Sequence, residues 1–165
     1  MEPSKKILVT AEINGREQTF ECTTRDTLAD ALRRSCGLTG IRLGCEHGVC
    51  GACTIDFDGR TARSCLMFAP QADGARIRTV EGLTDRTGHA PSEKDHLHPL
   101  QRAFAENFAL QCGFCTPGFL MVALELVAAN PQPTRAEIRE AISGNICRCT
   151  GYETIVDAIE HYTRD

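Results

Sequence analysis

Four closely spaced cysteines constrain the first half of the chain more than any other feature of the sequence. Cys45, Cys50 and Cys53 are separated by four and then by two residues, and Cys65 follows after eleven more. A loop that brings such thiols around one centre must bend sharply and let its own N–H groups approach the sulfur atoms. Glycines allow both, because they lack the Cβ atom that would obstruct the bend. The glycines interleaved with these cysteines are Gly44, Gly48 and Gly51.

The spacing C-x4-C-x2-C with a more distant fourth cysteine is typical of a 2Fe–2S cluster held by four thiolates. The predicted ligands of this first site are Cys45, Cys50, Cys53 and Cys65. His47 lies inside the loop and raises the alternative of mixed histidine and cysteine ligation, as in a Rieske centre. We favour a solvent-facing histidine, because four cysteines are already available there.

A second set of four cysteines lies in the C-terminal half, in two short motifs separated by 31 residues. The motifs are Cys112-Gly-Phe-Cys115 and Cys147-Arg-Cys149. Each precedes a predicted helix start, and a helix N-terminus offers free N–H groups and a positive dipole end to a negatively charged cluster. Arg148 adds positive charge between two of the cysteines. A Cys-x-Cys pair is unusual in structural zinc sites, so the set predicts a second 2Fe–2S cluster.

Composition narrows the class of protein and its surroundings. Ten of the 165 residues are cysteine, which is below the roughly 8–10% typical of disulfide scaffolds. The first residues contain no apolar signal segment, so we expect a cytoplasmic protein with reduced thiols. The net charge of −4 and the absence of a basic stripe argue against nucleic acid as a partner. The longest apolar run, residues 119–127, is too short to span a membrane.

The N-terminal half has the pattern of a small mixed domain. Asn14-Gly15 predicts a two-residue hairpin turn between two strands, and Asp26 is the predicted cap of the following helix. The strands are expected at 6–13, 16–22, 54–57, 61–65 and 75–80, and the helix at 27–35. This order is typical of an α+β fold, and we predict a β-grasp, plant-ferredoxin-like domain over residues 1–80.

The second half becomes helical after a polar linker predicted at 81–98. Leu100, Phe104 and Phe108 recur at helical spacing and predict one apolar face. Thr134 and Thr150 are each followed three residues later by glutamate, which is the pattern of a capping box. Four helices are expected, at 99–110, 116–129, 134–144 and from 150 onward. Residues 99–165 are therefore predicted to form a C-terminal four-helix bundle domain.

Some further residues could be given a functional role, but we favour a structural one. Cys22 and Cys36 remain after eight ligands are assigned, and we expect both to pack as small apolar side chains. A zinc site is disfavoured for the linker histidines, which are His89, His96 and His98. The nearly continuous apolar helix at 119–127 is expected in the bundle core, and whether it also forms a subunit interface is left open.

Taken together, the motifs resemble those of the small iron–sulfur subunit of the xanthine dehydrogenase, or molybdenum hydroxylase, family. This family includes aldehyde oxidase, carbon monoxide dehydrogenase and quinoline oxidoreductase-like enzymes. The resemblance covers nearly the whole chain. It is carried by Cys45-Glu-His-Gly-Val-Cys50-Gly-Ala-Cys53, Arg63-Ser-Cys65-Leu, Gln111-Cys-Gly-Phe-Cys-Thr-Pro-Gly118 and Gly144-Asn-Ile-Cys-Arg-Cys-Thr-Gly-Tyr152.

The resemblance implies an electron-transfer subunit without catalytic residues of its own. Its partners would be a large molybdopterin subunit and a medium FAD subunit, in a heterotrimer or its dimer. Electrons would pass from the molybdopterin centre to the cluster of the helical domain, then to the ferredoxin-like cluster, and on to FAD or another acceptor. Gln111 and Cys149 match the residues that contact the pterin, and Cys149 is also a cluster ligand.

Two alternatives compete with this interpretation. An independent ferredoxin would need only the first cysteine motif and would leave residues 99–165 unexplained. A zinc-binding module without redox activity would use the same thiols, but its zinc thiolates would be colourless. The chain itself carries no molybdenum or flavin domain, so both of those groups must belong to partners.

Overall fold

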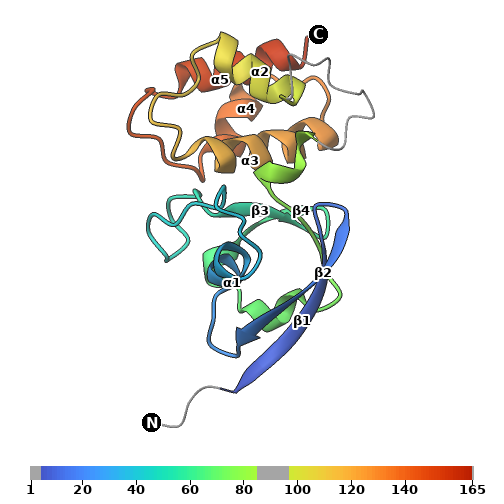
Figure 1. Cartoon of the computed structure of the whole chain (residues 1–165). Helices are drawn as coiled ribbons and strands as arrows, with labels where there is room; N and C mark the ends of the chain where they lie inside the picture. The colour runs from blue at the N-terminus through green and yellow to red at the C-terminus, as the bar shows by residue number, and fades with distance from the viewer. Residues whose placement is uncertain (1–4, 85–96, 165) are drawn as a thin grey trace.

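The computed structural model describes residues 5–84 and 97–164, which form a sheet domain followed by a helical domain (Figure 1). The two domains stack, with the helices covering one end of the sheet domain. Within the described residues, no helix has the length and apolar character needed to cross a membrane. The predicted linker residues 85–96, with His89 and His96, lie outside the described residues.

The sheet has the mixed order β2-β1-β5-β3-β4. Its strands are β1 (Lys6–Ile13), β2 (Arg16–Thr23), β3 (Thr54–Phe57), β4 (Arg60–Arg63) and β5 (Arg76–Arg78). β1 runs parallel to β5, and the other neighbouring pairs are antiparallel. The predicted hairpin turn is confirmed, because Asn14 and Gly15 both have positive φ angles, 53° and 80°. The α+β, β-grasp prediction for this half is confirmed.

One helix, α1 (Leu28–Arg34), packs against the sheet and closes the first core. The predicted cap is wrong by one residue. Thr27 is the N-cap, and its side chain accepts a hydrogen bond from the Asp30 N–H at 3.1 Å. Asp26 instead accepts from the Thr23 N–H at 2.7 Å and closes the turn before the helix. Three short 3-10 helices follow the strands, at η1 (Ser64–Leu66), η2 (Ala69–Ala72) and η3 (Val80–Gly82).

The helical domain contains the four predicted helices around a second core. They are α2 (Pro99–Glu106), α3 (Thr116–Ala129), α4 (Arg135–Ile142) and α5 (Glu153–Tyr162). The capping box at Thr134 is confirmed, because its backbone N–H donates to the Glu137 carboxylate at 2.7 Å and its hydroxyl accepts from the Glu137 N–H. The Arg135 guanidinium then pairs with carboxylates of α5 and ties the two helices together.

Three predicted helix ends are wrong. α2 ends at Glu106, and Phe108 is exposed with a φ angle of 53°, so it does not join the apolar face of Leu100 and Phe104. α5 begins at Glu153 and has no side-chain cap, so Thr150 does not form a capping box. At the start of α3, Cys115 is the N-cap and Thr116 is already helical.

α3 is apolar on nearly every side because it is shared between the two domains. Its first turns are buried from Gly118 to Ala123. One side faces α4, and the other contacts β3 and β4 of the sheet domain, as Figure 1 shows. The apolar character that suggested a subunit interface is thus accounted for, over these turns, by contacts inside the chain.

Candidate iron–sulfur sites

The first cysteine loop is shaped so that backbone N–H groups point at a thiol. The Cys50 N–H donates to the Cys45 sulfur at 3.3 Å. Gly48 and Gly51 have φ angles of 84° and 72°, which residues with a Cβ rarely adopt. A Cβ at Gly44 would lie 3.2 Å from the Cys50 sulfur. The predicted reason for glycines in this loop is therefore confirmed.

The loop brings its thiols together in two pairs, Cys45 with Cys50 and Cys53 with Cys65. Hydrogen bonds from the Cys50 and His47 N–H groups lower the pKa of Cys45 to about 6. Burial, together with the adjacent Cys53 thiol, raises the pKa of Cys65 to about 11. Cys45 thus favours the thiolate on its own, whereas Cys65 needs a bound cation to lose its proton. The side chain of His47 is exposed and contacts the Cys45 carbonyl oxygen rather than the thiols.

The second set of cysteines also forms two close pairs. The sulfur atoms of Cys112 and Cys149 lie 3.6 Å apart, and both residues are exposed. Cys115 and Cys147 form the inner pair, in which Cys147 is buried. Burial and the Cys147 thiol raise the pKa of Cys115 to about 12. For Cys147 burial opposes ionisation, but hydrogen bonds from the Thr150 side chain and backbone outweigh it and lower the pKa.

These pairs fit a binuclear iron core. Two thiolates on one tetrahedral metal with bonds of about 2.3 Å lie about 3.8 Å apart, close to the 3.6 Å between Cys112 and Cys149. A 2Fe–2S core needs two thiolates at each of its two irons, and each site supplies two pairs. Such a core takes up and releases one electron at a time. The two leftover cysteines behave as predicted, since Cys22 is buried in the first core and Cys36 packs against it.

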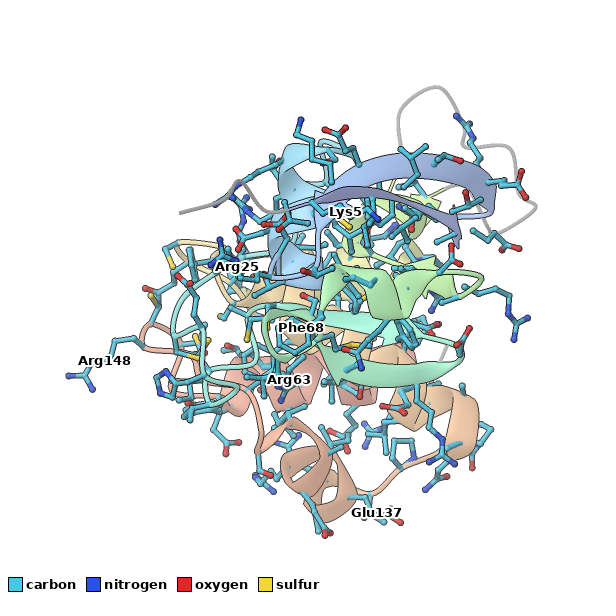
Figure 2. The ribbon with its side chains drawn as sticks, turned by 90° about the horizontal axis from the view of Figure 1, so that it is seen from below. Lys5, Arg25, Arg63, Phe68, Glu137 and Arg148 are labelled. Carbon is cyan, nitrogen blue, oxygen red and sulfur yellow. The ribbon has the colours of Figure 1, made fainter. Side chains whose placement is uncertain are left out.

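Thr150 has a different role from the predicted helix cap. Its hydroxyl donates to the Cys147 sulfur at 3.2 Å and accepts from the Tyr152 N–H. The Tyr152 hydroxyl in turn accepts from the Cys147 N–H at 3.0 Å. The sequence analysis missed the contacts of Thr150 and Tyr152 with Cys147. A hydroxyl residue directly after a Cys-x-Cys pair could have indicated the first of them. The predicted contribution of Arg148 is not supported, because its side chain points away from the body of the protein (Figure 2).

Replacing Thr150 with Val should lower the reduction potential of the helical-site cluster. Hydrogen bonds to ligand sulfurs stabilise the more negative, reduced state, and potentials depend on them. One bond of about 1 kcal/mol corresponds to about 40 mV for a single electron. A redox titration followed by EPR measures the shift. Thr163→Val is the matched control, since its hydroxyl donates to the Glu160 carbonyl oxygen in α5 and, among the described residues, to no cysteine. An equal shift in both variants would contradict the assignment.

Gln111 and Cys149 lie together at the surface of the second site. The Gln111 side-chain amide donates to the Cys149 carbonyl oxygen at 3.0 Å, and both residues are exposed. This contact joins the two halves of the second cysteine set across 38 positions of the chain. The structure thus brings together the two residues that the resemblance assigns to pterin contact.

A buried amide connects the two sites. Asn145 is only 2% exposed, and its side-chain amide donates to the Gly51 carbonyl oxygen at 3.2 Å. Its side-chain oxygen accepts from Arg63 at 3.1 Å. Next to it, the Ile146 N–H donates to the Cys50 carbonyl oxygen at 2.9 Å. The residue that precedes Cys147 is therefore bonded directly to a cysteine of the first site, so the two loops form one rigid junction.

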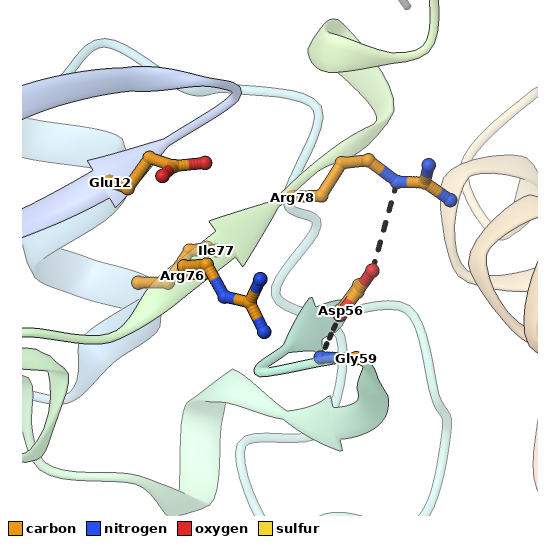
Figure 3. Close-up of a pocket in the computed structure, with 6 residues that line it drawn as sticks. All are labelled: Glu12, Asp56, Gly59, Arg76, Ile77 and Arg78. Carbon is orange, nitrogen blue, oxygen red and sulfur yellow. Dashed lines mark hydrogen bonds and ion pairs between the residues drawn. The ribbon is translucent and has the colours of Figure 1, made fainter.

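A polar cavity of about 140 Å³ lies elsewhere, on the sheet between β1, β5 and the β3–β4 hairpin (Figure 3). Its walls include Asp56, whose carboxylate accepts from the Gly59 N–H at 2.8 Å and lies 3.8 Å from Arg78. No cysteine lines this cavity. Asp56 stabilises the turn of the β3–β4 hairpin and pairs it with Arg78 of β5.

Comparison with known proteins agrees with these two sites. Residues 11–81 match the Fer2 family, a 2Fe-2S iron-sulfur cluster binding domain. Residues 79–160 match Fer2_2, a 2Fe-2S binding domain. The chain is thus of the class of proteins with two 2Fe–2S domains. The second match covers most of residues 99–165, which an independent ferredoxin would leave unexplained. Both family descriptions name 2Fe–2S binding, so they support iron–sulfur clusters rather than zinc at these thiols.

Individual relatives cover almost the whole chain. The small subunit of nicotine 6-hydroxylase from Paenarthrobacter nicotinovorans is 57% identical over 95% of this chain and 90% of its own length. The gamma subunit of caffeine dehydrogenase from Pseudomonas sp. (strain CBB1) is 49% identical over 93% and 89%. A chain of quinoline 2-oxidoreductase from Pseudomonas putida 86 superimposes with a TM-score of 0.89 at 51% identity, covering 98% and 96%.

The chain belongs to the small 2Fe–2S subunits of the molybdenum hydroxylase family. It is the iron–sulfur electron-transfer subunit of a multi-subunit oxidoreductase. The family resemblance drawn from the cysteine motifs is confirmed.

Proposed function

We propose that each cysteine set holds one cluster, with one close pair of thiols on each iron. The ligands of the ferredoxin-like site would be Cys45, Cys50, Cys53 and Cys65, and those of the helical site Cys112, Cys115, Cys147 and Cys149. The pairing of thiols within each site supports this assignment. The domain limits that go with it are 1–80 and 99–165, joined by a linker at 81–98.

Electrons enter at the helical site in this proposal and leave at the ferredoxin-like site. The observation that carries it is the exposed contact between Gln111 and Cys149. A neighbouring pterin could bond these two residues directly, whereas the inner ligand Cys147 is buried. The large subunit would bring the molybdopterin cofactor to this face.

The ferredoxin-like site has its own exposed apolar surroundings, which suit a second partner. Val49 in this loop and Leu66 next to the ligand Cys65 are both exposed. Leu66 packs over Gly48, where a Cβ would lie only 2.5 Å from it. A medium FAD subunit that covers these side chains would accept electrons there. The assembly is then a heterotrimer or its dimer, and ten free cysteines suit the reducing cytoplasm.

The relatives also suggest a substrate class for the complex. Nicotine, caffeine and quinoline, which name three of the proteins at 49–57% identity, are nitrogen heterocycles. Aldehyde oxidoreductases match at 38–41%. We therefore propose that the complex oxidises a ring carbon of a nitrogen heteroaromatic compound.

The purified complex should contain about four iron and four acid-labile sulfide per copy of this chain, because each of two clusters holds two of each. Iron and sulfide analysis after co-purification of the large and medium chains tests both the ligand assignment and the partners. A fully active complex with only two iron and two sulfide per copy would contradict two clusters. Isolation of this chain without a large partner would contradict the proposed assembly.

A further inference from the structure

Phe108 combines a left-handed backbone with a largely exposed side chain. It follows α2 with a left-handed φ of 53°, and the residue is 80% exposed. The Ala109 N–H donates to the Phe104 carbonyl and the Phe108 N–H to the Ala105 carbonyl, at 2.8 and 3.3 Å. These two bonds form a Schellman motif, in which Phe108 takes the left-handed position.

Glycine is the usual residue at that position, because a Cβ disfavours left-handed backbone. Tyr152 is also left-handed, but its hydroxyl bonds the Cys147 N–H and its ring packs edge-on against Phe119 at 6.2 Å. The contacts of that ring offset its backbone strain. Phe108 combines the strain with an exposed ring, so an advantage of the phenylalanine must come from outside the chain.

We propose that Phe108 is an anchor through which the molybdenum-carrying large subunit docks on the helical domain. The inference rests on the proposed function, which places that subunit over Cys149 and Gln111. Phe108 begins a short exposed surface that reaches this contact. It continues through Leu110, which is 39% exposed, to Gln111 and Cys112. Cys112 lies 3.6 Å from Cys149, sulfur to sulfur.

An interface of ordinary size that covers the exposed thiols of Cys112 and Cys149 would also cover Phe108. Cys112 lies four positions after Phe108, so their Cα atoms are at most about 14 Å apart. A standard interface covers about 800 Å² on each partner, a disc of roughly 16 Å radius. A subunit centred on the exposed thiols therefore reaches Phe108. Aromatic side chains, phenylalanine included, are also enriched in protein–protein interfaces.

The test compares binding of the cluster-loaded chain to the purified large subunit. We expect Phe108→Gly to bind at least tenfold more weakly, with unchanged iron content and with thermal stability equal to or above wild type. Phe108→Asn should lose binding to the same extent, because asparagine tolerates the left-handed position but has no ring. Leu8→Ser is the control, since Leu8 is 72% exposed and belongs to β1 of the sheet domain, outside the helical domain (Figure 1).

Each outcome separates the anchor from the proposed function. If the wild-type chain itself does not bind the large subunit, the proposed function fails. If wild type binds and Phe108→Gly binds equally well, the anchor is wrong. Weakened binding to the flavin subunit, or loss of self-association in sedimentation experiments, without an effect on the large subunit would also overturn it. An equal loss in Leu8→Ser would show a general effect of surface hydrophobicity and overturn it too.

Discussion

Replacing Cys115 with Ser should prevent substrate from reducing either cluster of the complex, while substrate still reduces the molybdenum centre. Cys115 belongs to the inner pair of the helical site, so its loss removes the centre at which electrons are proposed to enter. The ferredoxin-like cluster would remain in place but without a donor. Rapid-freeze EPR after mixing with substrate measures the reduction of each cluster separately. We expect the signal of the ferredoxin-like cluster to fall to that of a sample without substrate.

Cys50→Ser provides the reciprocal experiment. It removes the ferredoxin-like cluster, so substrate should still reduce the helical-site cluster while transfer to the final acceptor stops. Cys36→Ser is the control, because Cys36 is half-buried and belongs to neither set. Cluster loss can also unfold a small domain that depends on its metal, so all variants are compared as assembled complexes of verified iron content. Reduction of the ferredoxin-like cluster at the wild-type rate in Cys115→Ser would refute the proposed order.

The parts of the structure that sequence predicts well depend on short segments of chain. Asn14-Gly15 sets a hairpin turn by its own backbone preferences, and the box from Thr134 to Glu137 caps α4 with two local bonds. Cysteine spacing has the same local character, because a loop of a few residues fixes which thiols can meet. Such features therefore agree between sequence and structure.

Thr150 shows why an identical local pattern gives a different result. Like Thr134 it precedes a glutamate by three residues, but the Cys147 sulfur lies within reach of its hydroxyl. That sulfur takes the hydrogen bond, and the left-handed Tyr152 delays the start of α5 to Glu153. The prediction for Phe108 is wrong for a related reason. Its spacing continues the apolar face of Leu100 and Phe104, but α2 has already ended at Glu106.

The junction between the two domains could not be predicted from one sequence. Asn145 contacts Arg63 and Gly51, which lie 82 and 94 positions earlier in the chain. Asparagine within a ligand motif gives no indication of whether its amide bonds the cluster, solvent or another domain. Only the three-dimensional structure shows that this amide is buried between the two cysteine loops.

Gly118→Ala should open this junction and destabilise the whole chain. Gly118 lies in the first turns of α3, and a Cβ there would overlap the Gly51 carbonyl oxygen and approach the Asn145 amide nitrogen to 2.7 Å. Alanine is the better helix former by about 1 kcal/mol, so any loss must come from this steric overlap. Overpacking of a rigid site costs roughly 1–3 kcal/mol. We expect the upper end of that range here, because the group that the Cβ would meet is the Gly51 backbone, which cannot move aside as a side chain can.

We therefore expect the free energy of unfolding of Gly118→Ala to fall by about 2 kcal/mol, the difference between these two terms. For a chain of this length that corresponds to a melting temperature lower by roughly 4–8 °C. Visible absorbance of the clusters during heating follows the transition. Dipolar coupling between the two reduced clusters, measured by EPR, should weaken because the cysteine loops move apart. Ala129→Ser is the control, since Ala129 is exposed at the other end of the same helix. An unchanged melting temperature and coupling in Gly118→Ala would show that the loops do not depend on this close approach.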